Sequence, residues 1–282
     1  MRIRLARTTD LNRLAALCRA AVGPDDYVLE FLKEKVRARE VSVVEVRRRI
    51  VSMLGFTPCP DGSLWLGQIR THPAFRRRGL ASLLIEDARV RAARARRPAL
   101  RMWISVRNTA SRRMAESTGF RRVAVFSRRV AGPDEGPSRV GVTRRADDAF
   151  ERWRRSALRP AGSGYLCYEY HFLPLTLSTL RRIASARHLL MGPKAVLVFW
   201  RENTETGGVS VLAGGREALL AARRAVAERR LKHVWTFLPR TAKILRSARQ
   251  AGFVKGSWGS HAIVYERPVR QTVRSTSRAS SS

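Results

Sequence analysis

The chain has 282 residues, enough for two domains of ordinary size, and its 44% of hydrophobic residues exclude wholesale disorder. Lys and Arg number 56 against 22 Asp and Glu, so the formal net charge is +34, and the excess is spread along the chain. Three distant cysteines, Cys18, Cys59 and Cys167, argue against a disulfide framework or a zinc site, and no apolar run is long enough to span a bilayer.

The pattern of apolar residues predicts the elements of the first half of the chain. Stretches that alternate between apolar and polar residues predict strands, and stretches with a helical period predict helices. In chain order we predict a strand near 2–7, a helix over Asp10–Ala21, a helix from about Asp25, strands over much of 41–57, a strand over Leu64–Thr71, a helix from Gly79 to about Arg96, a strand over Leu100–Val106, a helix over Asn108–Thr118 and a strand from Phe120.

The second half repeats this order after a Gly- and Pro-rich segment, 131–138, which we interpret as a linker. A helix-capping Asp, a glycine that opens an Ala/Arg-rich helix and a Gly-Phe pair each recur at nearly constant spacing. The recurring positions are Asp10 and Asp147, Gly79 and Gly215, and Gly119 and Gly252. We therefore predict two copies of one α/β unit, at 1–132 and 138–270, followed by a flexible basic tail at 271–282.

The most informative stretch joins a strand to a helix over residues 69–81. A strand ends near Pro73, and a turn with three arginines leads to a helix that begins near Gly79. The unpaired N–H groups and the dipole at such a helix start favour a bound anion, and the small Gly79 and Ala81 leave room for a phosphate. Taken alone, the pattern is weak and favours a solvated basic turn over a phosphate site.

Two segments together resemble the GNAT superfamily of N-acetyltransferases. The stretch THPAFRRRGLASLLIEDA is similar to that family's acyl-coenzyme A signature, which lies between a strand and a helix. The strand Trp103–Asn108, the helix after it and Gly119-Phe120 are similar to the family's second element. The resemblance implies an α/β (α+β) fold of two tandem GNAT-like domains, each a mixed, mostly antiparallel splayed sheet flanked by helices.

The resemblance also implies how acetyl-CoA would bind. The backbone amides of the turn and helix start would hold its pyrophosphate, the backbone of the preceding strand would pair with the pantetheine, and one asparagine would bond the pantetheine arm. The residues concerned are Ile69, Arg70, Thr71, Arg76, Arg77, Arg78, Gly79, Leu80, Ala81 and Asn108. The chain departs from the family's pattern in its catalytic groups.

Many relatives have a general-acid Tyr where this chain has Ala115, and some have a Glu base where it has Ser105. Glu45 is a conceivable base, and His72 is expected to shape the turn. We assign no acid, base or metal ligand. A water chain acting on a naturally acidic α-amine and a catalytically silent site both stay open.

The second copy keeps the frame but lacks the site. The six-residue turn before its helix is missing, Glu217 is aligned with Ala81, and Thr241 takes the place of Asn108. The aromatic stretch Tyr165–Phe172 either lines an acceptor surface or forms a buried strand. We interpret residues 138–270 as a degenerate copy that enlarges the core or builds the acceptor surface.

These observations predict an acetyl-CoA-dependent N-acetyltransferase in the cytoplasm that acts on a primary amine of a protein, with a polyamine or another small amine as the alternative acceptor. The signature is most similar to the ribosomal-protein and protein N-terminal acetyltransferase branch. The alternative is a basic nucleic-acid- or ribosome-associated protein built on a catalytically weak GNAT scaffold. The high charge is also compatible with a coding bias toward arginine. No membrane contact is expected.

Overall fold

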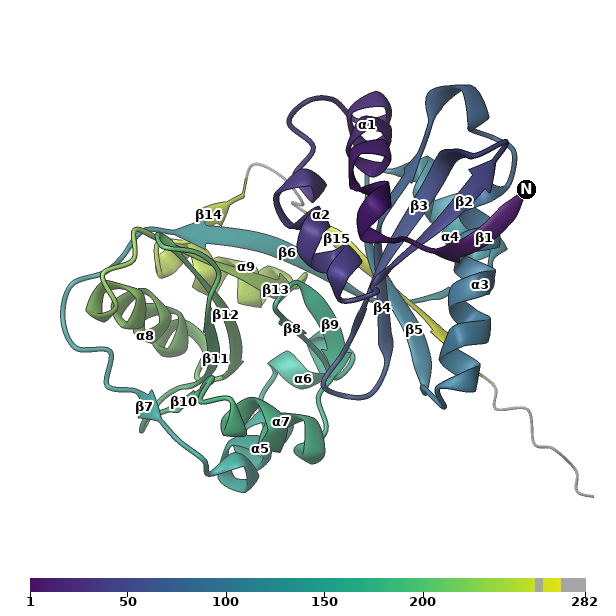
Figure 1. Ribbon diagram of the computed structural model, residues 1–282. Coiled ribbons are helices and arrows are strands. Elements are labelled where there is room, and N and C mark those ends of the chain that lie inside the picture. Colours follow the sequence, from purple (N-terminus) through teal and green to yellow (C-terminus); the bar gives the residue numbers. More distant parts are fainter. Residues whose placement is uncertain (257–260, 270–282) are drawn as a thin grey trace, which may run out of the picture. The chain divides into compact units, whose positions relative to one another are not determined.

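The computed structural model describes residues 1–256 and 261–269 (Figure 1). The predicted tail, 271–282, lies outside the described residues. The chain forms two compact units that each contain separate stretches of sequence. The first unit holds Met1–Pro58, Gly62–Leu100 and the segment from Arg267, and the second holds Cys59–Asp61 and Arg101–Glu266.

The first unit contains a sheet in the order β1-β2-β3-β4, in which every neighbouring pair is antiparallel. The predicted elements of this stretch are confirmed, and the strand Leu64–Thr71 has the predicted ends. The elements are β1 (Arg2–Leu5), α1 (Leu11–Ala21), α2 (Val28–Arg37), β2 (Val41–Val46), β3 (Arg49–Pro58), β4 (Leu64–Thr71) and α3 (Leu80–Arg94), with one-turn helices at Thr8–Asp10 and Pro73–Phe75. The first two residues of β5 (Ala99–Ser105) also belong to this unit.

Helices cover both faces of this sheet. Neighbouring residues of a strand point to opposite faces, so β2 packs against helices on both sides. Val41 and Val43 of β2 pack in one buried cluster with residues of α1 and α2. Ser42, between them, donates a hydrogen bond to Asp87 of α3 (3.1 Å). Figure 1 shows the same arrangement, with α1 and α2 on one side of β2 and β3 and α3 on the other.

The second unit contains a larger sheet in the order β5-β15-β6-β13-β12-β11-β10-β7, with β14 beside β6 and a separate hairpin β8-β9. Among the pairs with a defined register, β12 and β13 are parallel and the others are antiparallel. The elements are α4 (Thr109–Ser117), β6 (Arg121–Ala131), β7 (Gly141–Val142), α5 (Ala146–Arg154), α6 (Leu158–Ala161), β8 (Tyr165–Tyr168), β9 (His171–Pro174), α7 (Leu177–Ser185), β10 (Leu189–Met191), β11 (Val196–Arg201), β12 (Thr206–Ala213), α8 (Gly215–Glu228), β13 (His233–Pro239), α9 (Ala242–Gln250), β14 (Val254–Lys255) and β15 (Ala262–Pro268).

The parallel strands β12 and β13 separate along their length. The two strands pair from Thr206 and His233 as far as Val209 and Thr236. Beyond Val209, β12 continues to pair with β11 on its other edge. The hairpin β8-β9 packs beside this splay, and Ser210 of β12 donates a hydrogen bond to the carbonyl oxygen of Cys167. This is the splayed sheet predicted for the second copy.

The aromatic stretch Tyr165–Phe172 forms this hairpin and is largely internal. Phe172 is fully buried, and its ring lies 4.7 Å from that of Phe126 and 5.2 Å from that of Phe237 between centroids. Tyr170 stacks on the buried Trp235, with 4.3 Å between ring centroids. The interpretation of these aromatic residues as packing partners of a buried strand is therefore confirmed.

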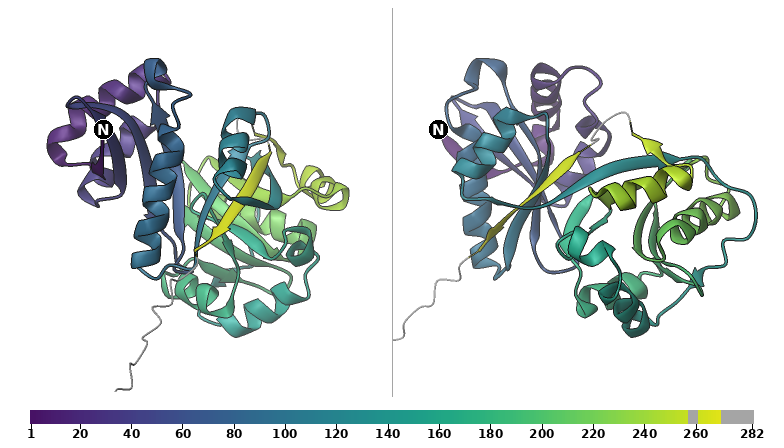
Figure 2. Two further views of the ribbon diagram at one scale, coloured as in Figure 1. Left: turned by 90° about the vertical axis from the view of Figure 1, so that its right-hand side faces the viewer. Right: turned by 180° about the vertical axis from the view of Figure 1, so that it is seen from behind.

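The last strand of the second half lies among strands of the first half. β15 runs between β5 and β6, and β6 in turn pairs with β13 (Figure 2). Each half thus places its final strand beside a strand of the other half. The two compact units therefore follow a different division from the predicted sequence copies, 1–132 and 138–270, which stay a prediction.

The predicted capping role of two aspartates is wrong. Asp10 precedes α1 but has a helical backbone conformation (φ −89°, ψ −8°), and its carboxylate accepts hydrogen bonds from the backbone N–H of Arg7 (2.9 Å) and from Arg4 (2.6 Å). Asp147 lies inside the first turn of α5, where it pairs with Arg181 (2.7 Å). In an arginine-rich chain a guanidinium competes with the helix amides for these carboxylates.

Candidate active site

The N-terminus of α3 has the geometry of an anion site. Its N-cap residue, Gly79, has a left-handed backbone (φ +71°), and no side chain caps the first turn. A β-carbon at Gly79 would meet no heavy atom within 4 Å. The first N–H groups of this 15-residue helix are therefore uncapped and approachable, and both conditions favour a bound phosphate.

The three arginines before Gly79 have different surroundings. Arg76 donates hydrogen bonds to the carbonyl oxygens of Ala21 (2.7 Å) and Thr71 (3.4 Å). The guanidinium of Arg78 lies 5.1 Å from the ring centroid of Phe75, and Arg77 is exposed with a left-handed backbone (φ +60°). The side chain of Arg76 thus ties the turn to the end of α1, and Arg77 and Arg78 supply the exposed charge.

His72 shapes this turn, as predicted. Its Nδ1 accepts a hydrogen bond from the backbone N–H of Ala74 (3.3 Å) at the start of the one-turn helix Pro73–Phe75. Its Nε2 lies 3.2 Å from Nη2 of Arg49, and its ring packs edge-on against Phe75. Both ring nitrogens are therefore engaged in structural contacts.

β4 carries a bulge directly before the predicted pantetheine strand. Gly67 pairs with Gly55 and Arg70 with Met53, so β4 has one residue more than β3 over this stretch. Gln68 has a left-handed backbone (φ +54°), and a β-carbon at Gly55 would lie 2.0 Å from its Oε1. Bulges of this kind leave a residue outside the ladder, so the main chain at Gln68 and Ile69 is turned away from β3.

Sequence reasoning missed Gln68, although a signal was present. Gly55 and Gly67 interrupt two strands that are otherwise rich in apolar residues. A glycine inside a strand is typical of a bulge or a close approach of another group. Here Gly55 leaves the space over which the Gln68 side chain lies.

A second missed residue is Asp26, on the connection between α1 and α2. Its buried carboxylate accepts two hydrogen bonds from Arg70 of β4, both of 2.7 Å. Burial alone would raise the pKa of Asp26, but the hydrogen bonds from Arg70 and from the backbone N–H of Val28 outweigh it, and the pKa is lowered. The pair holds the α1–α2 connection, with the exposed Tyr27, against the predicted pantetheine strand.

The structure places nine of the ten predicted cofactor residues in the first unit and Asn108 in the second. Asn108 is the N-cap of α4, and its Oδ1 accepts a hydrogen bond from the backbone N–H of Ser111 (3.0 Å). Ala115 of α4 is fully buried, and Ser105 at the end of β5 accepts from the backbone N–H of Arg107 (3.4 Å). No acid or base emerges at the positions of Ala115 and Ser105.

Glu45 is not suited to the role of base. Its carboxylate forms ion pairs with Arg4 (3.0 Å) and Arg13 (3.5 Å), which also hold Asp10. The hydrogen bond from Arg4 is the main cause of the lowered pKa of Glu45. A carboxylate stabilised in its charged form is a poor proton acceptor.

The corresponding helix start in the second unit has a more crowded N-cap. α8 begins directly after β12, so the absence of the six-residue turn is confirmed. Its N-cap is Gly214 (φ +110°), where a β-carbon would lie 2.1 Å from the carbonyl oxygen of Lys194. The backbone of the β10–β11 turn therefore packs against one side of this N-cap, and Gly214 and Gly215 stay exposed.

The alignment of Gly79 with Gly215 is wrong by one residue. The first helical hydrogen bond of α3 is accepted by the carbonyl of Gly79, and that of α8 by the carbonyl of Gly214. Arg216 therefore takes the place of Ala81, and Glu217 corresponds to the next residue. Because the second copy lacks the turn, no shared residues before the helix fix the alignment of α3 with α8.

Comparison with known proteins agrees with this geometry. Residues 8–120 match the model of the acetyltransferase (GNAT) family. The first half of the chain therefore contains a domain of the acetyltransferase (GNAT) family. None of the curated proteins compared with the chain matches it significantly.

Solved structures extend the likeness to both halves. A structure from Thermoplasma acidophilum is 16% identical with a TM-score of 0.64, and the alignment covers 95% of this chain and 100% of that one. A GCN5-related N-acetyltransferase from Sphaerobacter thermophilus is 15% identical with a TM-score of 0.63, and the alignment covers 96% of each chain. At these identities the likeness establishes a shared fold over nearly the whole chain.

Within the part of the chain that the structure describes, no helix is long and apolar enough to cross a membrane. Nor do three or more His, Cys, Asp or Glu side chains gather there in a group that could hold a metal ion.

Proposed function

We propose that this GNAT enzyme uses acetyl-CoA to acetylate a primary amine of a protein. The observation that carries the proposal is the N-terminus of α3, which is uncapped, open and preceded by the bulged strand β4. Its residues fit a pyrophosphate, because the backbone amides of Arg77 to Ala81 lie at a helix start with room for an anion, whereas the amide of Arg76 donates to the carbonyl of Pro73. A nucleic-acid-associated protein would not require such an opening.

Acetyl-CoA supplies the activated acetyl group, and the chain supplies contacts. The backbone of Ile69 to Thr71 would pair with the pantetheine, as in other family members. The carbonyl oxygen of Asn108 is engaged with Ser111, so its amide group is the part that would donate to the pantetheine arm. The bulge at Gln68 would aim a main-chain N–H at the thioester carbonyl and stabilise the charge that develops on its oxygen.

The acceptor amine loses its proton without an assigned enzymic base. An α-amino group titrates near pH 8, so an appreciable fraction is neutral at physiological pH. Holding that amine against the thioester carbonyl would then supply most of the rate enhancement. Ala115 leaves the departing thiolate without the family's tyrosine, so water would protonate it.

A protein acceptor with acidic residues around its amine is the class that the net charge of +34 favours. The test is incubation of the purified chain with acetyl-CoA and a dephosphorylated cell extract, followed by mass spectrometry of acetylated N-termini and lysines. New acetylation sites rich in Asp and Glu are expected. Transfer to small amines alone, with no protein product, would contradict the proposal.

A further inference from the structure

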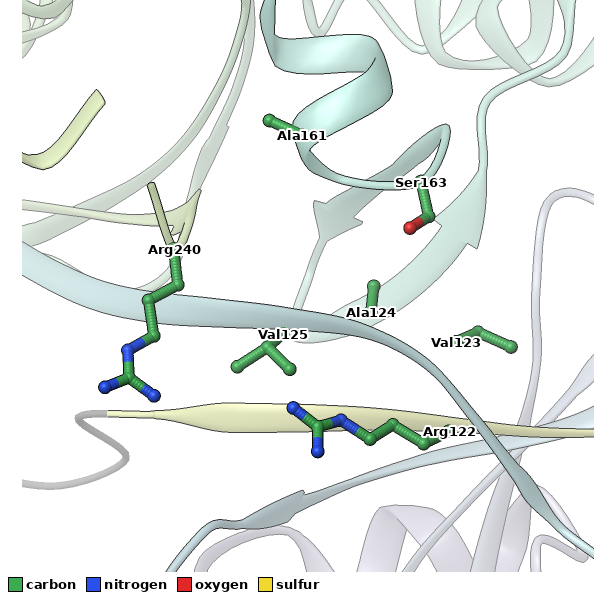
Figure 3. A pocket seen from close by; sticks show the side chains of 7 residues that line it. All are labelled: Arg122, Val123, Ala124, Val125, Ala161, Ser163 and Arg240. Atoms are coloured by element: carbon green, nitrogen blue, oxygen red, sulfur yellow. The ribbon is translucent and has the colours of Figure 1, made fainter. Parts of the chain in front are cut away.

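A hollow in the second unit lies where β6 continues past the end of β13 (Figure 3). β13 ends at Pro239, opposite Phe126, and the preceding residues of β6, 122–125, pair with β15 on their other edge. On the β13 side, the backbone N–H of Arg240 donates to the carbonyl of Val125 (3.3 Å) as the chain turns into α9. The result is a pocket of about 500 Å³ at an interrupted strand edge.

The lining of this pocket combines cations with a small apolar floor. Arg122 and Arg240 extend on the same side of β6 and flank Val125 (Figure 3). Ser163 adds a hydroxyl from the loop after α6, and Ala161 and Val123 add apolar surface. Every lining side chain is basic, neutral polar or apolar, so nothing in the lining neutralises the arginines.

Among the residues that the structure describes, neither arginine has a carboxylate partner. Across residues 1–256 and 261–269, the ion pairs of the chain include neither Arg122 nor Arg240. By contrast, the buried Arg101 of the same sheet is held by both Asp61 and Glu266. Two guanidinium groups left unneutralised at one concave site attract an oxyanion, which they can bind through charge-assisted hydrogen bonds.

The adjacent helix adds to this attraction. Arg240 directly precedes Thr241, the N-cap of the nine-residue helix α9. The positive end of the helix dipole therefore lies beside the arginine and favours negative charge at the same place. The Thr241 side chain accepts from the backbone N–H of Ile244, so the helix supplies a field here and the arginines supply the donors.

We propose that this pocket is an anion-binding site for the oxyanion group, carboxylate or phosphate, of a ligand with a short apolar stem. The volume far exceeds that of a single water molecule, about 30 Å³, so a lone ion would leave most of the pocket unfilled. The guanidinium groups bind the oxyanion, and Val125 and Ala161 contact the stem. The site belongs to the second unit and does not depend on the acetyl-CoA assignment.

The test uses the full chain and two probes, inorganic phosphate and glutarate. The binding of each probe is measured from amide chemical shifts in NMR titrations. The site variant is Arg122→Gln with Arg240→Gln. Its matched control is Arg144→Gln with Arg187→Gln, which removes two charges from another hollow of the same unit. Gln keeps most of the side-chain length, and equal melting temperatures check that each variant is folded.

Saturable binding of at least one probe is expected, weakened about tenfold or more in the site variant and by less than about twofold in the control. Tighter binding of phosphate would assign a phosphorylated ligand, and tighter binding of glutarate would assign a carboxylate on an apolar stem. Equal losses of affinity in the two variants would show that net charge alone causes the binding, and would contradict the proposed site. So would the absence of saturable binding of either probe by the unmodified chain.

Discussion

The starts of α3 and α8 show how similar backbones come to differ in what they can bind. Both helices follow a strand, and both have a left-handed glycine at the N-cap, Gly79 and Gly214. In α3 the six-residue turn moves the chain aside and leaves the N-cap open. In α8 the turn is missing, and the carbonyl of Lys194 lies over the glycine. The helix dipole is common to both, so the two helix starts differ in the turn that precedes them and in the room around the N-cap.

In the second unit, packed side chains occupy the space beside the splayed strands. The space beside the splay of β12 and β13 takes the hairpin β8-β9, whose aromatic residues are buried against β6 and β13. Ser210 forms a hydrogen bond with Cys167 of the hairpin. A cofactor arm in the same place would have to displace a buried aromatic cluster.

The largest expected effect is on cofactor binding. Gly79→Glu should weaken acetyl-CoA binding by about 100-fold or more, because the new carboxylate would face the pyrophosphate. Isothermal titration calorimetry should give one site per chain for the unmodified protein. Gly215→Glu is the matched control, since it also has a positive φ (+54°) and open space for a β-carbon. Two equivalent sites, or equal effects of both substitutions, would contradict the comparison.

The next effect concerns the pair between Asp26 and Arg70. Asp26→Asn should lower the free energy of unfolding by about 3 kcal/mol at pH 7, because it leaves a largely buried guanidinium without its partner charge. Urea denaturation measures this effect. The exposed pair of Asp148 with Arg145 is the control, and Asp148→Asn should cost less than about 1 kcal/mol.

The same pair predicts a pH dependence. Because the pKa of Asp26 is lowered in the folded state, its contribution is complete above the unfolded pKa of about 4 and is lost as the pH falls through the folded pKa. The unmodified chain should therefore lose more stability than Asp26→Asn between about pH 5 and pH 2. Parallel stability curves for the two proteins would show that the pair does not act in this way.

A moderate effect is expected at the bulge. Gly55→Ala places a methyl group where the amide end of Gln68 now lies, so the Gln68 side chain must move. If the bulge positions the thioester, kcat should fall about tenfold with little change in the KM for acetyl-CoA. Gly67→Ala is the control on β4, because its methyl group would meet only Trp65, at an ordinary 3.9 Å. A matching fall in kcat for Gly67→Ala would assign the effect to strand stability.

The smallest effects are expected at the missing acid and base. Ser105→Ala should change kcat by less than about twofold, and Ala115→Tyr should restore no acid, because position 115 is fully buried and a ring there would destabilise by about 1–3 kcal/mol. The rate on a peptide amine should rise with pH toward the pKa of that amine and show no alkaline decline. An alkaline limb that disappears in one variant would identify an acid.

The features that were predicted correctly from the sequence are marked by local patterns. The ends of β4 were recovered because the turn residues 61–63 before it and a proline after it mark them, and the start of α3 because Gly79 is the glycine its left-handed N-cap requires. The pair of Asp26 with Arg70 spans 44 residues, and nothing local to either residue marks it. The role of Asp10 was misassigned because the guanidinium groups of Arg4 and Arg13 and the backbone N–H of Arg7 bind its carboxylate in place of the amides of α1. The place of β15 between β5 and β6 depends on strand pairing across the whole chain, which no local pattern encodes.

The position of β15 also governs how the chain can be made and cut. Arg101 of β5 is bonded to Glu266 of β15, 165 residues further on, so this pairing forms only after the whole intervening segment has been synthesised. Contacts of such long range slow folding, because a large loop must close before they form. A cut at the linker would separate β15 from β5 and β6 from β13, and each fragment would then carry an unpaired strand edge prone to aggregation. The predicted repeats should therefore be expressed together as one chain.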